Sequence, residues 1–383
     1  MTFRIEKEFG KGRLGKLKTK SGRVTTPLFM PIATRGAVKT ILPSEIKEIG
    51  FEVVLGNTYH LWLKPGTDLI KQYENSLHGF MNWNKSILTD SGGFQIFSLG
   101  ERAKERFGKS GVKLTEKGVH FVDTENGNKH FMRPEDSIQI QLDLDTDIIM
   151  CLDECPPYPC SYKQAKKSLE LTTRWAKRCK EYFDKKTLNK KKKPLIFGIV
   201  QGSNYEDLRI QSAQELVEIG FDGYAIGGVA VGEPRENLRD ILKWTIPHLP
   251  VDKPRYLMGL GRPNELVTSV FSGVDMFDCV IPTREGRHGR MFLWKNNPEK
   301  IDLTKVQDFY ETVNLKNAKF KENLGPVDKY CDCPLCKNFS RAYLRHLFDV
   351  GEPLARRLAS IHNLTFYFKL TESLNNCLRK NNE

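Results

Sequence analysis

Residues 194–202 read PLIFGIVQG, and this segment decides the fold class of the chain. From Leu195 to Val200 no charged or amide side chain interrupts the run, and Gln201 ends it. A short run without polar alternation is typical of a strand that is buried on both faces, which is the situation in a parallel sheet. The segment therefore predicts an interior parallel strand with a polar side chain at its carboxyl end.

The same pattern recurs along residues 28–280. The further runs are Leu28–Ile32, Phe51–Leu55, Ser86–Leu88, Asp147–Leu152, Gly223–Ile226, Arg255–Met258 and Val274–Val280. Amphipathic stretches separate them, and helices are predicted over Ser161–Asp184, Tyr205–Ile219 and Pro263–Phe271. About eight strand–helix units fit a closed (β/α)₈ barrel, with a doubly wound open sheet as the alternative.

Polar or glycine residues follow several of these runs at the same position. They are Asp90, Asp153, Gln201, Gly227-Gly228, Met258-Gly259 and Asp278. A barrel brings the carboxyl ends of its strands together at one mouth, so these residues are expected to share a pocket. A single aspartate at a strand end is more often a helix cap. The recurrence at one position favours a functional pocket.

Composition and charge limit the possible classes of binding partner and the possible cellular compartments. The chain has 383 residues, 39% of them hydrophobic, which excludes a mostly disordered protein. Its net charge of +13 indicates a polyanionic partner, without distinguishing nucleic acid from anionic lipid. No signal peptide or apolar run of about 18 residues is present, so a cytoplasmic protein with reduced thiols and no membrane partner is expected. The basic run Lys185–Lys193 is interpreted as a solvated loop.

Three of the nine cysteines lie within six residues, at Cys331, Cys333 and Cys336. Three thiolates in one tight turn can converge on a tetrahedral ion, whereas they cannot all pair as disulfides. His346, His362 and Cys377 are the candidates for a fourth ligand. A closed set of this kind is typical of a structural zinc ion, one per subunit, and here it would anchor helices predicted over Phe339–Asp349 and Glu352–Asn363.

The predicted organisation has two parts. Residues 1–282 form the (β/α)₈ barrel, with N-terminal β elements and a β-hairpin insertion near residues 100–131. Residues 283–383 form a small zinc-binding subdomain with C-terminal helices, inserted late in the barrel.

Several segments together resemble the bacterial tRNA-guanine transglycosylases (queuine tRNA-ribosyltransferases). The matching segments are 89–95 (TDSGGFQ), 153–159 (DECPPYP), 198–202 (GIVQG), 227–233 (GGVAVGE), 256–261 (YLMGLG), 276–284 (MFDCVIPTR) and the Cys-x-Cys-x-x-Cys cluster with a histidine 26 positions later. The resemblance extends from about Phe3 to the C-terminal helices. It implies exchange of guanine at the wobble position of GUN-anticodon tRNAs for a 7-deazaguanine, in queuosine biosynthesis, by a homodimer.

The resemblance also implies a role for each matching residue. Asp278 is the implied nucleophile, which forms a covalent ribosyl-enzyme, and Asp90 is the implied general acid/base. His362 becomes the implied fourth zinc ligand. The implied substrate pocket comprises Asp90, Ser91, Gly92, Gly93, Phe94, Asp153, Gln201, Gly228, Val229 and Met258, with Phe94 and Met258 stacking on the base. The implied RNA-binding residues are Gly259, Leu260, Gly261, Arg262, Pro263, Asn264, Glu265, Thr283, Arg284, Glu285, Gly286 and Arg287.

Val229 departs from the bacterial pattern, which usually has leucine there. The incoming base is therefore expected to be either 7-aminomethyl-7-deazaguanine or queuine. The segments between Arg284 and Cys331 and before Leu195 are also longer than usual. Alternative functions are a non-catalytic tRNA-binding member of the family, an archaeal-type enzyme with further RNA-binding domains, and a zinc-dependent barrel hydrolase with its ligands at the barrel mouth.

Overall fold

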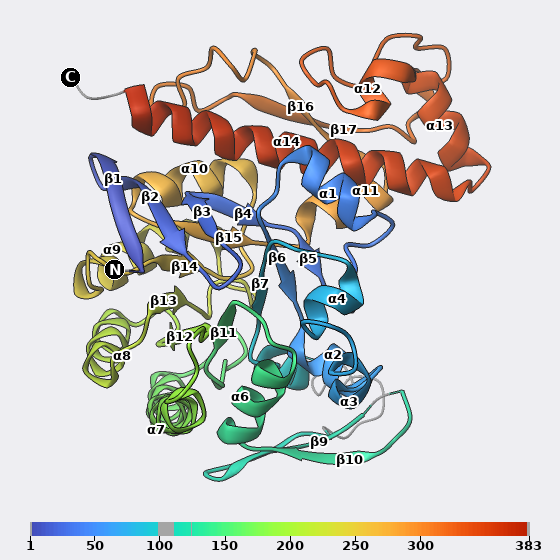
Figure 1. The fold of residues 1–383 in the computed structure, drawn as a ribbon. Helices are drawn as coiled ribbons and strands as arrows, with labels where there is room; N and C mark the ends of the chain where they lie inside the picture. The colour runs from blue at the N-terminus through green and yellow to red at the C-terminus, as the bar shows by residue number, and fades with distance from the viewer. Residues whose placement is uncertain (1, 99–110, 124, 381–383) are drawn as a thin grey trace.

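The computed structural model describes residues 2–98, 111–123 and 125–380, and its centre is a parallel β-barrel (Figure 1). All strand pairs of the barrel sheet are parallel. The strands, in spatial order, are β4 (Leu28–Met30), β15 (Met276–Asp278), β14 (Arg255–Leu257), β13 (Gly223–Ile226), β12 (Leu195–Val200), β11 (Ile148–Met150), β7 (Ser86–Thr89), β6 (Val53–Gly56) and β5 (Ile32–Ala33).

The barrel closes because β4 and β5 are two parts of one interrupted strand. β4 pairs with β15, β5 pairs with β6, and only Pro31 separates the two parts. Pro31 has no N–H to donate, which explains the break in strand pairing. Its carbonyl still accepts a hydrogen bond of 2.9 Å from the backbone N–H of Leu55. The predicted (β/α)₈ barrel is therefore confirmed, with the predicted strand at Leu28–Ile32 broken at its proline.

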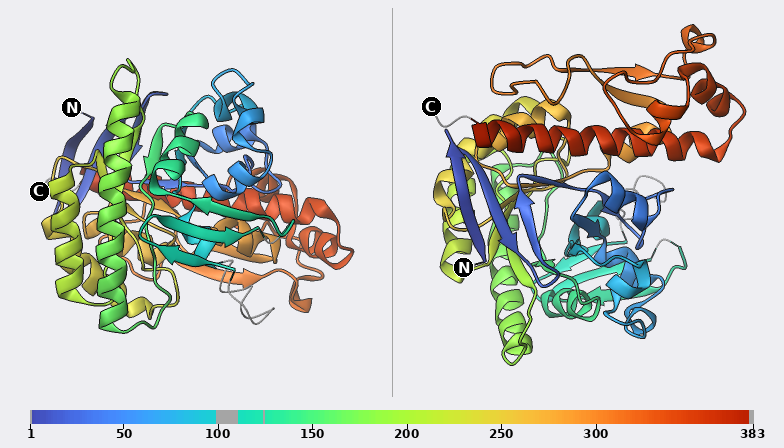
Figure 2. Two further views of the ribbon diagram at one scale, coloured as in Figure 1. Left: turned by 90° about the horizontal axis from the view of Figure 1, so that it is seen from below. Right: turned by 45° about the horizontal axis from the view of Figure 1, so that its top comes forward.

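Helices surround the barrel, and α7 and α8 lie side by side on its outside (Figure 2). The helices of the barrel half are α1 (Pro43–Ile49), α2 (Thr58–Leu63), α3 (Thr67–Ile70), α4 (Leu77–Met81), α6 (Pro134–Asp143), α7 (Tyr162–Thr187), α8 (Glu206–Ile219), α9 (Leu238–Thr245) and α10 (Pro263–Phe271). The α7 helix begins at a capping box, in which Ser161 Oγ accepts from the Gln164 N–H and the Gln164 side chain accepts from the Ser161 N–H. Among the described residues, no helix is both long enough and apolar enough to cross a membrane.

The C-terminal part of the chain follows β15. Its elements are α11 (Ile281–Arg287), β16 (Arg290–Trp294), β17 (Tyr310–Asn314), α12 (Pro334–Asn338), α13 (Arg341–Asp349) and α14 (Pro353–Lys380). α14 crosses the barrel between α1 and α10 and carries β16, α12 and α13 on its other side (Figure 1). It continues well past the predicted end at Asn363 because Phe366, Leu370 and Leu374 extend its buried face. The division at residues 282 and 283 falls within α11.

Two three-stranded antiparallel sheets flank the barrel, and β16 and β17 pair in a third, two-stranded one. The insertion forms a three-stranded sheet in its described part rather than a simple hairpin, with β8 (Lys113–Thr115), β9 (Gly118–Val122) and β10 (Lys129–Met132), while residues 99–110 lie outside the described residues. The N-terminal strands are β1 (Phe3–Phe9), β2 (Gly12–Lys18) and β3 (Arg23–Thr26).

The N-terminal sheet closes the end of the barrel at which the strands begin. Thr19 Oγ1 lies 2.8 Å from Ser86 Oγ at the start of β7, and the Ser21 N–H donates to Asp147, just before β11. The first three residues of the basic run Lys185–Lys193 form the end of α7 rather than a loop, and the rest of the run leads to the start of β12, at this same end. The basic run is therefore at the opposite end of the barrel from the carboxyl ends of the strands.

A buried ion pair between Arg13 and Asp275 fastens this sheet to the barrel. Arg13 also donates to the Val251 carbonyl at 2.6 Å, and Asp275 accepts from the Arg255 N–H at 2.7 Å. Replacing Asp275 with alanine leaves the Arg13 cation buried without its carboxylate. We predict that Asp275→Ala lowers the free energy of unfolding by about 3–5 kcal/mol, measured by urea denaturation.

The matched control is Asp308→Ala, which removes the exposed ion pair of Asp308 with Lys295. Exposed pairs contribute about 0–1 kcal/mol, so this variant should unfold almost like the wild type. Equal urea midpoints for the two variants would show that the Arg13–Asp275 pair does not stabilise the barrel.

Candidate active site

Asp90 follows β7 directly and is held by four donors. Its Oδ1 accepts from the Thr58 N–H at 2.9 Å and the Gly92 N–H at 3.2 Å, and its Oδ2 accepts from Gln95 Nε2 at 2.7 Å and from Asn57 Nδ2. The side chain is buried, and burial raises the pKa of Asp90 to about 6 although these donors favour the anion. A carboxyl with this pKa can exchange a proton near neutral pH.

Asp153 follows β11 and faces residues from both neighbouring strands. Its Oδ1 accepts from Ser91 Oγ at 3.2 Å and its Oδ2 from Gln201 Nε2 at 2.8 Å. Gln201 Oε1 is buried and has no hydrogen-bond partner among the described residues. Burial raises the pKa of Asp153 to about 6. The pair presents polar atoms that a ligand with a mixed donor and acceptor edge can satisfy.

Asp278 is the last residue of β15 and is also buried. Its Oδ1 accepts from the Tyr256 hydroxyl at 2.6 Å and from the Gly259 N–H at 2.8 Å. Within the described part of the chain, no hydrogen bond to Oδ2 is found. Burial raises the pKa of Asp278, and these two donors oppose that shift. The pKa of Tyr256 is raised well above its usual value by burial and then by Asp278, and Asp90 is close enough to add to this effect.

The barrel thus places Asp90, Asp153, Gln201 and Asp278 at the carboxyl ends of its strands, at one mouth. Ser91 links Asp90 to Asp153. It directly follows Asp90 in the sequence, and its hydroxyl donates to Asp153. Gly93 is needed for this approach, since a Cβ there would lie 2.8 Å from the Asp153 carbonyl oxygen. Phe94 is 46% exposed beside these residues, Met258 is partly buried and Val229 is buried.

Sequence reasoning assigned no role to four residues that hold this site. Asn57 and Gln95 hold Asp90, Tyr256 holds Asp278, and Arg209 of α8 binds the carbonyls of Gly227 and Gly228. For Arg209 a signal was available, because it shares the helical face of Ala213 and Leu216, which are buried. A cation within an apolar stripe indicates a buried polar contact.

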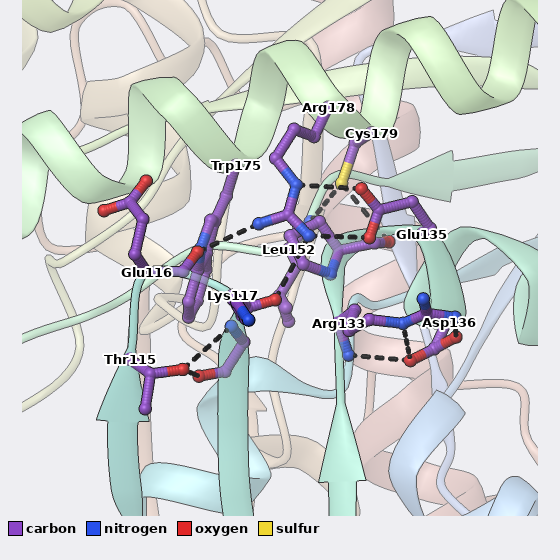
Figure 3. Close-up of polar contacts among 12 residues, drawn as sticks. Thr115, Glu116, Lys117, Arg133, Glu135, Asp136, Leu152, Trp175, Arg178 and Cys179 are labelled. Atoms are coloured by element: carbon purple, nitrogen blue, oxygen red, sulfur yellow. Dashed lines mark hydrogen bonds and ion pairs between the residues drawn. The ribbon is translucent and has the colours of Figure 1, made fainter.

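α7 supports the strand end that carries Asp153 (Figure 3). The Leu152 N–H donates to Cys179 Sγ at 3.4 Å, and Cys179 contacts the Pro134 carbonyl at the start of α6. Arg178 pairs with Glu135 through two hydrogen bonds of 2.8 Å and donates to the Lys117 carbonyl of the inserted sheet. One helix therefore ties β11, α6 and the inserted sheet together.

The segment Gly259–Glu265 runs along the mouth beside Asp278. Arg262 is exposed, and its N–H donates to Glu265 Oε2 at 2.8 Å. Glu265 also pairs with Arg235, and the Asn264 side chain accepts from the Tyr310 hydroxyl at 3.0 Å. Leu260, Gly261 and Pro263 are buried.

The second predicted RNA-binding segment, from Thr283 to Arg287, lies on α11. Arg284 is 52% exposed and contacts Glu285 at 3.4 Å. Arg287 is half-buried; its pKa is lowered by burial and then by Arg284, and its Nη1 has no partner among the described residues. Gly286 lets α11 approach α14 closely, since a Cβ there would lie 2.8 Å from a carbonyl oxygen of α14.

A candidate metal centre lies apart from the barrel mouth, where Cys331, Cys333 and Cys336 meet His362 of α14. The four ligand atoms all lie within 4.8 Å of one another. His362 Nε2 is 2.8 Å from the Phe292 carbonyl, which leaves Nδ1 facing Cys336 Sγ at 3.2 Å. A carbonyl that accepts from one ring nitrogen orients the other for a metal. This Cys₃His group could bind one metal ion, and the candidates His346 and Cys377 are not part of it.

We predict that the purified chain carries one equivalent of metal by elemental analysis and that Cys333→Ala loses it, because three ligands hold an ion much less tightly than four. Cys377→Ala, which changes a buried thiol on α14 that is not part of the cluster, should keep the full equivalent. Undiminished metal in Cys333→Ala would contradict the assignment of this cluster.

Comparison with known proteins places these features in one family. Residues 8–382 match the family described as queuine tRNA-ribosyltransferase. The queuine tRNA-ribosyltransferase of Francisella tularensis subsp. novicida is 48% identical over 378 residues, which cover 99% of this chain and 95% of that protein. The Vibrio cholerae serotype O1 protein of the same name is 48% identical over 374 residues, 98% of this chain and 91% of its own length. The chain belongs to the queuine tRNA-ribosyltransferase family.

Proposed function

We propose that this chain is a tRNA-guanine transglycosylase that exchanges guanine at the wobble position of GUN-anticodon tRNAs for a 7-deazaguanine. The observation that carries the proposal is the set of three buried carboxyl groups at one barrel mouth, Asp90, Asp153 and Asp278, in a chain of this family. Each has a different set of hydrogen-bond partners, which suits three different tasks.

Asp278 attacks C1′ of the target ribose. Its Oδ1 is engaged by Tyr256 and Gly259, so the other oxygen is available for a bond to carbon. As that bond forms, the bond from C1′ to N9 of guanine breaks and its electron pair leaves with the base. The incoming base then displaces Asp278 from the same carbon. Two inversions retain the configuration of the ribose.

Asp90 carries the protons of both half-reactions. In its protonated form it donates to the departing guanine, and the resulting carboxylate accepts the N9 proton of the incoming base. Its raised pKa, about 6, makes both forms accessible near neutral pH. The four donors from Asn57, Thr58, Gly92 and Gln95 keep its two oxygens in place during this cycle.

The base edge is read by Asp153, Gln201 and Gly228. The carboxylate of Asp153 accepts from N1–H and the exocyclic amine of guanine, while Gln201 and the Gly228 N–H donate to O6. The hydrogen bond between Asp153 and Gln201 gives way to these contacts when the base enters. Phe94 and Met258 stack on the two ring faces, which contributes about 1–3 kcal/mol per base.

The target nucleotide leaves the stack to reach the pocket. In this proposal Arg284 and Arg287 contact bases of the anticodon loop, and Arg262 contacts its backbone. The remaining residues of these two segments, from Gly259 to Glu265 and from Thr283 to Arg287, hold the three arginines at the mouth. The Cys₃His cluster binds a structural zinc ion, which stabilises the C-terminal subdomain without touching substrate. The working form is a cytoplasmic homodimer.

Two alternative functions are less well supported. A non-catalytic family member has no need of a nucleophile with one free oxygen, which Asp278 provides. A zinc-dependent hydrolase needs ligands at the barrel mouth, whereas the metal-binding group found among the described residues lies in the C-terminal subdomain.

We predict that Asp278→Ala abolishes exchange of labelled guanine into a GUN-anticodon tRNA and that Asp278→Asn forms no covalent protein–RNA adduct on denaturing gels. Both variants should still bind tRNA in a gel shift, because the arginine contacts are intact. Turnover by Asp278→Ala would contradict the nucleophile assignment. The wild-type assay, run in parallel with queuine and 7-aminomethyl-7-deazaguanine, identifies the incoming base that Val229 leaves open.

We predict that guanine binding weakens as the pH falls through about 6. Burial raises the pKa of Asp153 to about 6, so below that pH the carboxyl is protonated and no longer accepts two hydrogen bonds from the base. Calorimetric titration between pH 5 and 8 should show the Kd rising by up to about tenfold per pH unit on the acid side. Asp278→Asn should keep this dependence and Asp153→Asn should lose it. A Kd that is unchanged down to pH 5 would contradict the assignment.

A further inference from the structure

Arg209 is a fully buried cation whose hydrogen bonds all go to backbone carbonyls. Its Nε donates to Ser203 at 2.7 Å, its Nη1 to Val200 at 3.2 Å and Gly227 at 2.7 Å, and its Nη2 to Gly228 at 2.9 Å. No carboxylate pairs with it among the described residues. Its guanidinium therefore joins the carboxyl end of β12 to the carboxyl end of β13, the two strand ends that carry Gln201 and Gly228.

Burying a cation without a carboxylate partner costs free energy of folding. We therefore expect the buried charge of Arg209 to have a specific role. Burial lowers the pKa of Arg209 to about 10, and the group stays charged at neutral pH. An apolar residue would fill the same space under α8 without this cost. What an apolar residue cannot do is hold four carbonyl oxygens in fixed directions.

Peptide geometry transmits the effect to the pocket. In a trans peptide the C=O and the following N–H point in opposite directions. Because Arg209 holds the carbonyls of Gly227 and Gly228, the N–H groups of Gly228 and Val229 point away from α8. α8 packs on β12 outside the barrel, so that direction leads toward its mouth (Figure 1).

Both N–H groups are free to bind a ligand. In the described ranges neither the Gly228 N–H nor the Val229 N–H donates to another residue. Gly228 has φ +60°, and a Cβ there would lie 2.7 Å from Gln201 Oε1 and 3.3 Å from Arg209 Nη2. The turn is therefore specified by the absence of a side chain at Gly228 and by the guanidinium behind it.

We infer that Arg209 is a positioning residue that aims the backbone N–H groups of Gly228 and Val229 at the O6 carbonyl of the purine base, and so selects 6-oxopurines. The inference rests on the proposed function, since it assigns a base to this pocket. A site that presents fixed donors rejects an analogue without the matching acceptor, because the donors are then left unpaired.

The test measures binding of two probes, guanine and 2-aminopurine, which lacks the 6-oxo group. Guanine binding is followed by calorimetry and 2-aminopurine binding by its fluorescence, so neither needs turnover. In R209Q the Kd for guanine should rise by about tenfold while the Kd for 2-aminopurine changes by less than about twofold.

R255Q is the matched control. Arg255 is also a buried arginine that donates to carbonyls, those of Leu249 and Gly273, but it lies at the opposite end of the barrel. This variant should lower the melting temperature and leave the ratio of the two Kd values unchanged. A purely structural role for Arg209 would give the same result in R209Q.

An unchanged Kd ratio in R209Q would overturn the inference, whether both affinities are kept or both are lost by the same factor. If R209Q does not fold, R209K replaces it, since a single ammonium keeps the charge but cannot span both glycine carbonyls; loss of guanine preference is again expected. Failure of the wild-type protein to bind guanine or to exchange it would count against the proposed function instead.

Discussion

The pairing of β15 with β4 is the constraint on which the rest of the structure depends. It joins Asp278 to Met30 across the seam of the barrel and so converts an open sheet into a closed one. In an open sheet with the same strands, the four strands β14, β13, β12 and β11 would separate Asp278 on β15 from Asp90 after β7. Closure brings all the strand ends to one mouth, and the N-terminal sheet, with the buried Arg13–Asp275 pair, closes the other end.

Different hydrogen-bond donors then distinguish the carboxyl groups that closure brings together. All three are buried, yet each has its own donors: four for Asp90, a side-chain hydroxyl and an amide for Asp153, and a phenol with a backbone N–H on one oxygen of Asp278. Burial raises the three pKa values, and the donors limit the rise. A carboxyl that is neither fully solvated nor paired with a cation can exchange protons, bind donors or act as a nucleophile. Among the described residues no arginine shifts the pKa of these three acids, so the positive charge of the chain does not neutralise them.

Much of the fold was predictable because buried parallel strands leave a strong pattern. The run at Leu195–Val200 matches β12 at both ends, and Pro263–Phe271 matches α10, whose N-terminal proline marks its first turn. The Cys-x-Cys-x-x-Cys spacing predicted a metal centre, but it left three candidates for the fourth ligand. The spacing of Phe366, Leu370 and Leu374 is compatible with a longer α14, but only the contacts with β1, β2 and β4, which are distant in sequence, show that this part of the helix is packed on the barrel.

The sequence by itself determined the number and type of the repeating units, the residues at the strand ends and the metal-binding turn, because each depends on neighbours along the chain. The tertiary structure alone decided which groups hold the acids, and it brings His362, the fourth ligand that the family resemblance implied, to the three cysteines. Asn57, Tyr256 and Arg209 act across strands, and no local periodicity records a hydrogen bond between residues that are distant in sequence. His362 is selected over His346 because α14 carries it under the cysteine turn, with its second nitrogen held by Phe292.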